Sequence, residues 1–116
     1  MENKRPSALK RSSDFELIKF QGHKKKASNW LLLAFQKNQL GHLRYGCTIS
    51  RKVAPAVLRN KLKRWTREFF RHQADQGFNP ELDINLVFRP MPDQFFKKLV
   101  FKDFEAILNR AVKDIK

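Results

Sequence analysis

The stretch "LRYGCTISRKVAPAVLRNKLKRWTREFFR", residues 43–71, changes its hydrophobic period at Pro55. Before Pro55, apolar residues alternate with small or basic ones, which indicates a β-strand with one face against a core. Pro55 itself fixes a backbone angle that suits the first turn of a helix. Beyond it the apolar residues recur with a period of about 3.6, so an amphipathic helix follows the strand. The buried stripe of that helix is expected to contain Leu58, Leu62, Trp65 and Phe69.

Another strand is expected just upstream, at "SNWLLLAFQKN", residues 28–38. This segment is apolar on both faces and rich in aromatics, which favours a strand buried on at least one side. We expect it to form a hairpin with the strand that precedes Pro55, across a turn at residues 38–42. One face of the resulting sheet is then core, and the other carries small and basic groups. In the strand before Pro55, the residues predicted to face the core are Leu43, Tyr45, Cys47 and Ile49.

A short helix is predicted for "SSDFELIKFQG", residues 12–22. Ser12 or Ser13 can cap the free amide groups at its start, and Gly22 can end it. The three lysines that follow, at residues 24–26, are expected in a loop or at a strand edge.

The two ends of the chain differ in pattern. Residues 1–11 are basic and lack periodicity, so they are expected to form a flexible basic arm. "LDINLVFRP", residues 82–90, is typical of a strand ended by its proline, and residues 95–116 have the pattern of a terminal helix. The inner face of that helix is expected to carry Phe101, Phe104, Leu108 and either Ala111 or Val112.

Length and charge limit the possible functions. At 116 residues the chain is expected to be a single domain, residues 1–116, and 41% hydrophobic residues with eleven Phe argue against disorder. Twenty-five Lys plus Arg oppose eleven Asp plus Glu, which gives a net charge of +14. Because so large a surplus repels itself, a polyanionic partner is expected. Nucleic acid is the first candidate and an anionic membrane surface the second.

Other classes of protein are disfavoured. No apolar run approaches the roughly 20 residues that span a bilayer, and no apolar segment typical of a signal peptide follows the basic N-terminal residues. We therefore expect the protein to stay in the cytoplasm. A lone Cys47 allows no internal disulfide, and it lacks zinc-ligand spacing with the three scattered histidines. We interpret Cys47 as a small core residue rather than a nucleophile.

The helix after Pro55 has a strongly basic outer face. A rotation of about 100° per residue places Arg59, Lys63, Arg67 and Arg71 away from the apolar stripe, with Asn60 among them. Cations four residues apart repel each other by a few tenths of a kcal/mol. Phosphates remove that repulsion, and Arg can grip a phosphate bidentately. The alternative is a solvated basic face that only keeps the protein soluble.

Three aromatic residues leave alternatives open. Phe70 falls within the basic sector, where it can stack on a base or pack under a loop. Phe15 and Phe20 are five residues apart and so lie on different faces of their helix. We expect one in the core and the other in a groove that binds single-stranded RNA, with Lys10 and Arg11 beside it. The alternative is that both rings are buried.

The sequence resembles the protein subunit of bacterial ribonuclease P. The family has a strand R-x-G-x-x-[VI]-[SA]-[KR]-K followed by a helix with R-N-R-x-K-R-x-x-R-E. Lys61 replaces the third residue of the R-N-R triplet, and Ala54-Pro55 stands where the family often has Gly. "DF" at residues 14–15, followed by Gly22, agrees as well. The positions that match the two motifs are Arg44, Gly46, Ile49, Ser50, Arg51, Lys52, Arg59, Asn60, Lys63, Arg64, Arg67 and Glu68.

The resemblance implies a fold. It is an α/β (α+β) two-layer sandwich, similar to ribosomal proteins, with the order α-β-β-β-α-β-α. It also implies a left-handed βαβ crossover, which sequence pattern alone would not predict because right-handed connections dominate.

The resemblance also implies a function, removal of the 5′ leader from precursor tRNA. In this family the catalytic RNA subunit positions Mg²⁺ and the attacking water, so no catalytic or metal-binding residue is expected on the protein. The implied contacts to the catalytic RNA are Arg51, Lys52, Arg59, Asn60, Lys61, Lys63, Arg64, Arg67 and Arg71. The implied lining of the substrate leader groove is Lys10, Arg11, Phe15, Trp30, Phe35 and Ser50.

Three competing functions remain. A structural or ribosomal RNA-binding protein fits the composition equally well, and only the spaced motif argues against it. A DNA-binding regulator would need another helix just upstream of the basic helix, where the alternating strand lies. A free-standing nuclease would need acid, base or metal-ligating residues at useful spacing, and the acids are scattered. We therefore expect RNA partners, and neither DNA nor a membrane.

Overall fold

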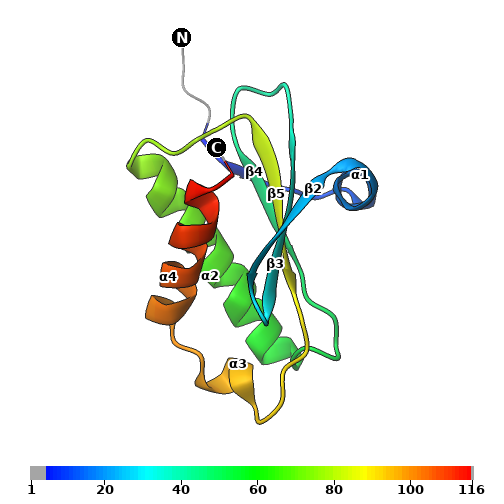
Figure 1. The fold of residues 1–116 in the computed structure, drawn as a ribbon, viewed down its shortest axis with the longest axis vertical. Coiled ribbons are helices and arrows are strands. Elements are labelled where there is room, and N and C mark those ends of the chain that lie inside the picture. Colours follow the sequence, from blue (N-terminus) through cyan, green and yellow to red (C-terminus); the bar gives the residue numbers. More distant parts are fainter. Residues whose placement is uncertain (1–4, 116) are drawn as a thin grey trace.

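The structure, a computed structural model, describes residues 5–115 as a mixed α+β fold built on one five-stranded sheet (Figure 1). The strands lie in the order β1-β4-β5-β3-β2. Among the described residues, no helix is both long and apolar enough to cross a membrane. In chain order the elements are β1 (Ser7–Ala8), α1 (Ser12–Gln21), β2 (His23–Ser28), β3 (Leu31–Lys37), β4 (Arg44–Thr48), α2 (Ala56–Asp75), β5 (Leu82–Phe88), α3 (Phe95–Lys98) and α4 (Phe101–Lys113).

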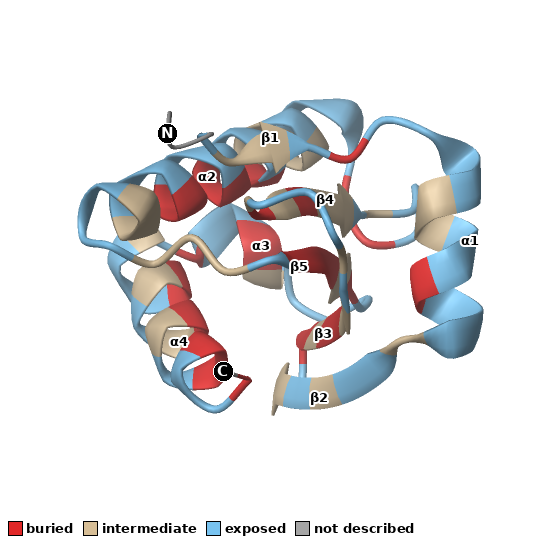
Figure 2. Cartoon of the chain, turned by 90° about the horizontal axis from the view of Figure 1, so that it is seen from above, coloured by how far each residue is buried: buried red, intermediate tan, exposed pale blue. Residues whose placement is uncertain are grey.

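Two helices cover one face of the sheet and a third lies against the other. α2 and α4 pack on the same side, whereas α1 stands alone on the opposite side (Figure 1). The buried sides of α2 and α4 face the sheet, and a short buried part of α1 does the same (Figure 2). Leu62, Trp65 and Phe69 of α2 are buried as predicted, with Leu58 partly buried beside them. The predicted inner face of the C-terminal helix is confirmed as well.

The predicted hairpin between β3 and β4 is wrong, because β5 lies between these two strands. β5 runs antiparallel to β3, with Leu86 opposite Leu33, and parallel to β4, with Leu86 opposite Cys47. A strand buried on both faces is typical of the centre of a sheet, and nearly every residue of β5 is buried. β4, α2 and β5 therefore form the βαβ unit, whose left-handed crossover stays a prediction.

The N-terminal segment is partly ordered, so the predicted flexible arm is wrong for its second half. Ser7 and Ala8 form β1, parallel to β4. The Ser7 amide donates to the Leu43 carbonyl at 3.0 Å, and the Leu9 amide donates to the Tyr45 carbonyl at 2.7 Å. Leu9 is buried. Residues 1–4 of the predicted arm lie outside the described residues.

The helix ends differ in detail from the prediction. Arg11 is the N-cap of α1 and makes no side-chain cap hydrogen bond, so neither predicted serine cap forms. Gly22 ends α1 as predicted, and a Cβ at this position would lie 2.5 Å from the Ile18 carbonyl oxygen. The predicted terminal helix is two helices, because the chain is extended at Leu99 and Val100. That break lets α3 and α4 both direct aromatic residues into the core.

Candidate nucleic-acid interface

The outer face of α2 carries cations that have no acidic partner. Lys63, Arg64, Arg67 and Arg71 are all exposed, and within residues 5–115 none of them forms an ion pair. Asn60 is exposed on the same helix. This placement agrees with the periodicity of the sequence. The outer face of α2 is therefore a row of charges that the protein leaves uncompensated.

Two residues of the basic motif are partly committed to the protein itself. Arg59 donates from Nη1 to the Ala54 carbonyl at 2.9 Å and is only half-exposed. The Lys61 ammonium lies 4.7 Å from the centroid of the Trp65 ring, a cation–π contact that holds the side chain along the helix. Each of these two side chains thus makes a contact within the protein.

The loop between β4 and α2 adds further cations at the N-terminal end of that helix. Ser50, Arg51 and Lys52 are exposed. The Val53 amide donates to the Ser50 carbonyl at 3.0 Å, which closes the turn. The loop follows the end of β4 and precedes the first turn of α2, in which Arg59 is the first cation.

A pocket of about 370 Å³ joins α1, β4 and α2. Phe15 of α1 lines it, together with Gly46 and Cys47 of β4 and with Lys63 and Arg67 of α2. Burial raises the pKa of the Cys47 thiol, which keeps it neutral. The sequence analysis treated the groove beside α1 and the basic face of α2 as separate surfaces. In the structure, the aromatic ring and the two cations share one concave site.

Trp30 and Phe35 do not belong to the predicted groove. Trp30 is 7% exposed and packs in the core, with ring centroids 6.2 Å from Phe88 and 5.6 Å from Phe95. Phe35 has the same strand parity as Leu33, so it lies on the face covered by α2 and α4. The groove lies on the opposite face. The segment is apolar on both faces, so the sequence pattern alone did not show on which face Phe35 lies.

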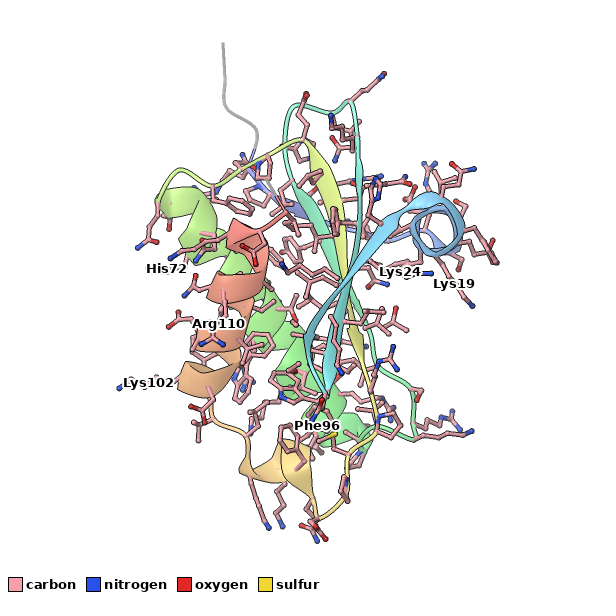
Figure 3. All side chains as sticks on the ribbon, viewed as in Figure 1. Lys19, Lys24, His72, Phe96, Lys102 and Arg110 are labelled. Atoms are coloured by element: carbon pink, nitrogen blue, oxygen red, sulfur yellow. The ribbon has the colours of Figure 1, made fainter. Side chains whose placement is uncertain are left out.

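The face of the sheet beside α1 carries residues that the sequence analysis missed. Lys24 and Lys26 of β2 pair with Ala34 and Leu32 of β3, so all four share this face. Ala34 packs with Ile18 and Leu9 in a small apolar cluster under α1. Figure 3 shows Lys24 and Lys19 on the side of the molecule that holds α1. The face of the sheet beside α1 therefore carries basic residues at its β2 edge, which is the edge away from the pocket at β4.

The other aromatic and basic residues considered as RNA contacts differ in how far they are buried. Phe70 is fully buried and stacks on Tyr45 of β4 at 5.4 Å, so it packs in the core rather than under a loop, and base stacking is excluded. Phe20 is 78% exposed on the outer side of α1. Phe15 is partly buried against the cluster of Leu9, Ile18 and Ala34 and also lines the pocket. Neither ring is fully buried, so the alternative that both are buried is wrong. Lys10 and Arg11 are exposed just before α1, but neither lines the pocket.

A polar cluster also lies on the α1 side of the sheet, at Arg44. Its Nε and Nη2 donate to the two carboxylate oxygens of Asp83 at 2.8 and 2.6 Å. Its Nη1 donates to Asp14 Oδ2 of α1 at 3.3 Å. The hydrogen bonding of Arg44 to Asp83, above all, raises the pKa of Arg44, so its guanidinium stays charged. Asn38 donates a further bond to Asp83 at 2.8 Å.

Asn85 is another buried polar residue on the same face. Its Nδ2 donates to the Thr48 hydroxyl at 2.9 Å, while its buried Oδ1 has no hydrogen-bond partner. Gly46 is opposite Asn85 in the β4–β5 register. The floor beneath α1 is therefore polar at its centre, unlike the floor under α2 and α4.

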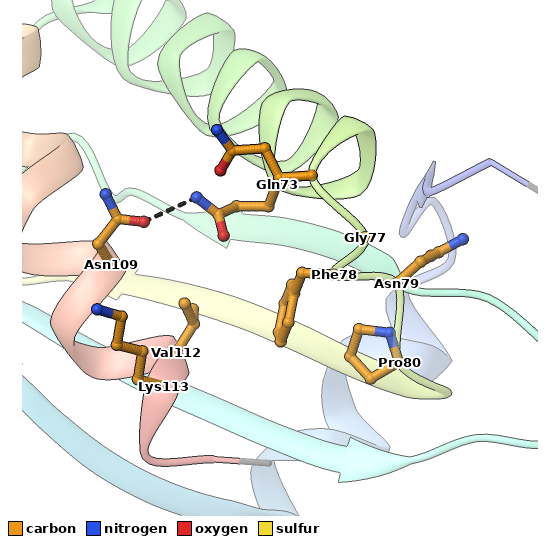
Figure 4. A pocket seen from close by; sticks show the side chains of 9 residues that line it. Gln73, Gly77, Phe78, Asn79, Pro80, Asn109, Val112 and Lys113 are labelled. Atoms are coloured by element: carbon orange, nitrogen blue, oxygen red, sulfur yellow. Dashed lines mark hydrogen bonds between the residues drawn. The ribbon is translucent and has the colours of Figure 1, made fainter.

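A larger pocket, of about 570 Å³, lies between the C-terminal end of α2 and α4. Gln73 donates to Asn109 at 2.7 Å across its mouth, and Phe78 and Lys113 contribute to the lining (Figure 4). None of the predicted site residues lines this pocket. Its rim has one cation rather than a row, so we place the candidate interface at α1, β4 and α2.

Comparison with known proteins gives consistent matches. The family model described as Ribonuclease P matches residues 3–112. The ribonuclease P protein component of Thermotoga maritima is 36% identical over 112 residues, which cover 96% of this chain and 93% of that protein. The corresponding protein of Fusobacterium nucleatum is 34% identical over 110 residues, covering 95% and 97%.

Solved structures show the same similarity in three dimensions. The RNase P protein from Thermotoga maritima superposes with a TM-score of 0.80 at 29% identity, covering 97% of this chain and 98% of that one. The Staphylococcus aureus RNase P protein superposes with a TM-score of 0.78 at 28% identity, covering 94% of each chain.

Proposed function

This chain belongs to the ribonuclease P protein family, and from that premise we propose that it binds the catalytic RNA of ribonuclease P and the 5′ leader of precursor tRNA. The single observation that carries the proposal is the row of exposed, unpaired cations on α2, next to a pocket walled by an aromatic ring. A surface of this kind matches a phosphate backbone on one side and a nucleobase on the other.

The proposed role of the α2 face is to dock on the catalytic RNA. Lys63, Arg64, Arg67 and Arg71 repel one another in the free protein, because cations four residues apart on a helix are neighbours. RNA phosphates neutralise these charges and release condensed counterions, so binding should weaken steeply as salt rises. The free energy gained on binding RNA is largest for cations that are not already paired with an acidic side chain of the protein.

The proposed role of the pocket is to hold the single-stranded leader. Phe15 offers a face on which a base can stack, and Lys63 and Arg67 lie on the facing wall to meet the backbone charge. Stacking is worth about 1–3 kcal/mol per base and tolerates any sequence. A site of this kind would position the leader without reading it strictly, as processing of many precursor tRNAs requires.

We assign the chemical step to the RNA subunit. In the part of the chain that the structure describes, no three His, Cys, Asp or Glu residues form a group that could hold a metal ion. No step of the proposal therefore passes through a metal bound to these side chains alone. We propose that the RNA subunit and the substrate hold Mg²⁺ and hydrolyse the phosphodiester, while the protein neutralises charge and orients the leader.

Reconstitution tests this division of labour. The protein alone should not cleave precursor tRNA, and its addition to the RNA subunit should raise cleavage most at low Mg²⁺. Double substitution of Lys63 and Arg67 by Ala should reduce the slope of log affinity against log salt by about 1 to 2. Double substitution of Lys102 and Arg110 by Ala is the matched control, because both side chains are exposed on α4, away from the pocket (Figure 3).

Two results would contradict the proposal. Cleavage by a preparation free of RNA would reject the assignment of chemistry to the RNA subunit. An equal change of slope in the two double variants would reduce the α2 face to general electrostatic attraction, as expected for a structural RNA-binding protein.

A further inference from the structure

Two short motifs, far apart in the sequence, meet across the gap between α1 and the sheet. One is Asp14-Phe15 in the first turn of α1, and the other is Arg44 with Gly46 on β4. Arg44 bonds to Asp14, and Gly46 lies under the Phe15 ring. We infer that these four residues form an interlock that sets the position of the Phe15 ring, and with it the leader-binding wall of the pocket.

The charged half of the interlock bridges the helix and the sheet. Two of the three hydrogen bonds of Arg44 go to Asp83, which is 2% exposed, and this bidentate pairing fixes the guanidinium on the sheet. Only the third bond, from Nη1, crosses to Asp14. Because Asp83 also accepts a bond from Asn38, its carboxylate is held on both sides. Arg44 is thus a fixed arm that reaches up to α1.

The apolar half depends on a missing side chain. A Cβ at Gly46 would lie 2.7 Å from Cε1 and 2.8 Å from Cζ of Phe15, and 3.2 Å from Leu9 Cδ1. Contacts this short do not occur, so any other residue at position 46 must push the ring away. Gly46 is thereby a seat for the ring, as glycine is wherever another group approaches the backbone closely.

Few other contacts would hold α1 in this place. Ile18 is the one buried residue of the helix, and it packs on Leu9 and Ala34. A single apolar anchor leaves a helix free to pivot about it. The interlock lies near the other end of α1 from Gly22 and removes that freedom. Arg44 is therefore not free to bind phosphate, and we class it as a positioning residue.

This inference rests on the proposed function, since it concerns the wall that holds the leader. Its test compares precursor tRNA carrying a long leader with the same tRNA carrying a minimal leader, both bound by the reconstituted holoenzyme. In Asp14→Asn the affinity gained from the long leader should fall by about threefold to tenfold, the size expected when a modest polar contact that orders a binding wall is lost. Affinity for the RNA subunit and kcat should stay unchanged.

Glu16→Gln is the matched control. Glu16 is exposed on the same helix and forms no ion pair within residues 5–115. Both substitutions remove one negative charge, and on general electrostatics both should tighten RNA binding slightly. The interlock predicts opposite signs: looser leader binding for Asp14→Asn, and unchanged or tighter binding for Glu16→Gln.

Gly46→Ala provides an independent arm. It should weaken leader binding in the natural background but cost little more in a Phe15→Ala background, because no ring then remains to be displaced. Hydrogen exchange of the free protein should also show faster opening of α1 in Asp14→Asn than in Glu16→Gln.

The outcomes separate the two ideas. If the wild-type holoenzyme binds both tRNAs equally, the proposed leader site is wrong and this inference fails with it. If the wild type gains from the leader while Asp14→Asn behaves like Glu16→Gln, the leader site stands and the interlock is overturned. Additive costs of Gly46→Ala and Phe15→Ala would overturn the seat for the ring.

Discussion

The face of the sheet under α2 and α4 and the face under α1 are covered by different kinds of contact. The first is a continuous aromatic core in which Trp30, Phe88 and Phe104 contact one another with centroids 6.2 to 6.4 Å apart. The second has three buried apolar residues, Leu9, Ile18 and Ala34, next to a network of hydrogen-bonded charges. Packing secures one layer, whereas α1 depends on a few directional contacts. The side of the sheet under α2 and α4 therefore provides most of the stability, whereas the α1 side can shift more easily.

The largest expected effect tests the packed side. Phe104→Ala removes a fully buried ring that also contacts Trp65 at 5.5 Å. We expect the free energy of unfolding to fall by about 3–5 kcal/mol, from lost transfer energy and a residual cavity. Urea unfolding followed by circular dichroism measures this. A loss no greater than that of a surface substitution would contradict the description of this face as a close-packed core.

The next effect tests the α1 side. Ile18→Ala removes the buried apolar anchor of α1 and should cost about 2–3 kcal/mol, the lower part of the range for such truncations, since the small cluster can relax. The same change should speed hydrogen exchange in α1 while leaving α4 protected. Uniform loss of protection in both helices would show that the two faces form one cooperative unit, and the comparison would then fail.

The smallest effect concerns a contact at the rim. Lys25 of β2 donates to Asp114 Oδ2 at 2.6 Å, just beyond α4, and this hydrogen bond lowers the pKa of Asp114. A carboxyl group whose pKa is lowered on folding stabilises the fold at any pH above its unfolded-state pKa. That contribution disappears as the pH falls through its folded-state pKa. Because Asp114 is exposed, Asp114→Asn should shift Tm little at neutral pH and not at all in high salt or strong acid. Thermal scans across pH and salt check this, and a shift that persists in strong acid would assign the effect to something other than charge.

Local periodicity predicted the elements of this fold better than their neighbours. The stripe of Leu62, Trp65 and Phe69 was predicted because a helix repeats its buried face within a few residues. The neighbours of β4 could not be predicted in this way, since β5 follows it only after the whole of α2. Strand pairing depends on contacts between distant segments, and the nearest apolar strand was the wrong partner.

The candidate site followed the same division. The cations of α2 were found from spacing alone, whereas the cluster of Arg44 with Asp14 and Asp83 joins residues 30 and 39 positions apart. Asp83 stands in no pattern that marks it, and Asp14 was noted only as part of the "DF" pair, without its partner. Trp30 and Phe35 were wrongly placed because their segment is apolar on both faces, so its pattern does not show which rings face the first helix. In the structure, most of the aromatic residues that were candidates for stacking on RNA bases pack in or against the core.

β2 is an edge strand of the sheet, and it carries three consecutive lysines, Lys24 to Lys26. An uncovered outer strand can recruit a strand from another molecule and so begin aggregation, and lysine is a residue that blocks such pairing. A chain with eleven Phe is prone to aggregate once such pairing begins. The lysine run would thus protect the protein in the interval between its synthesis and its assembly with RNA, whatever it later contributes to binding.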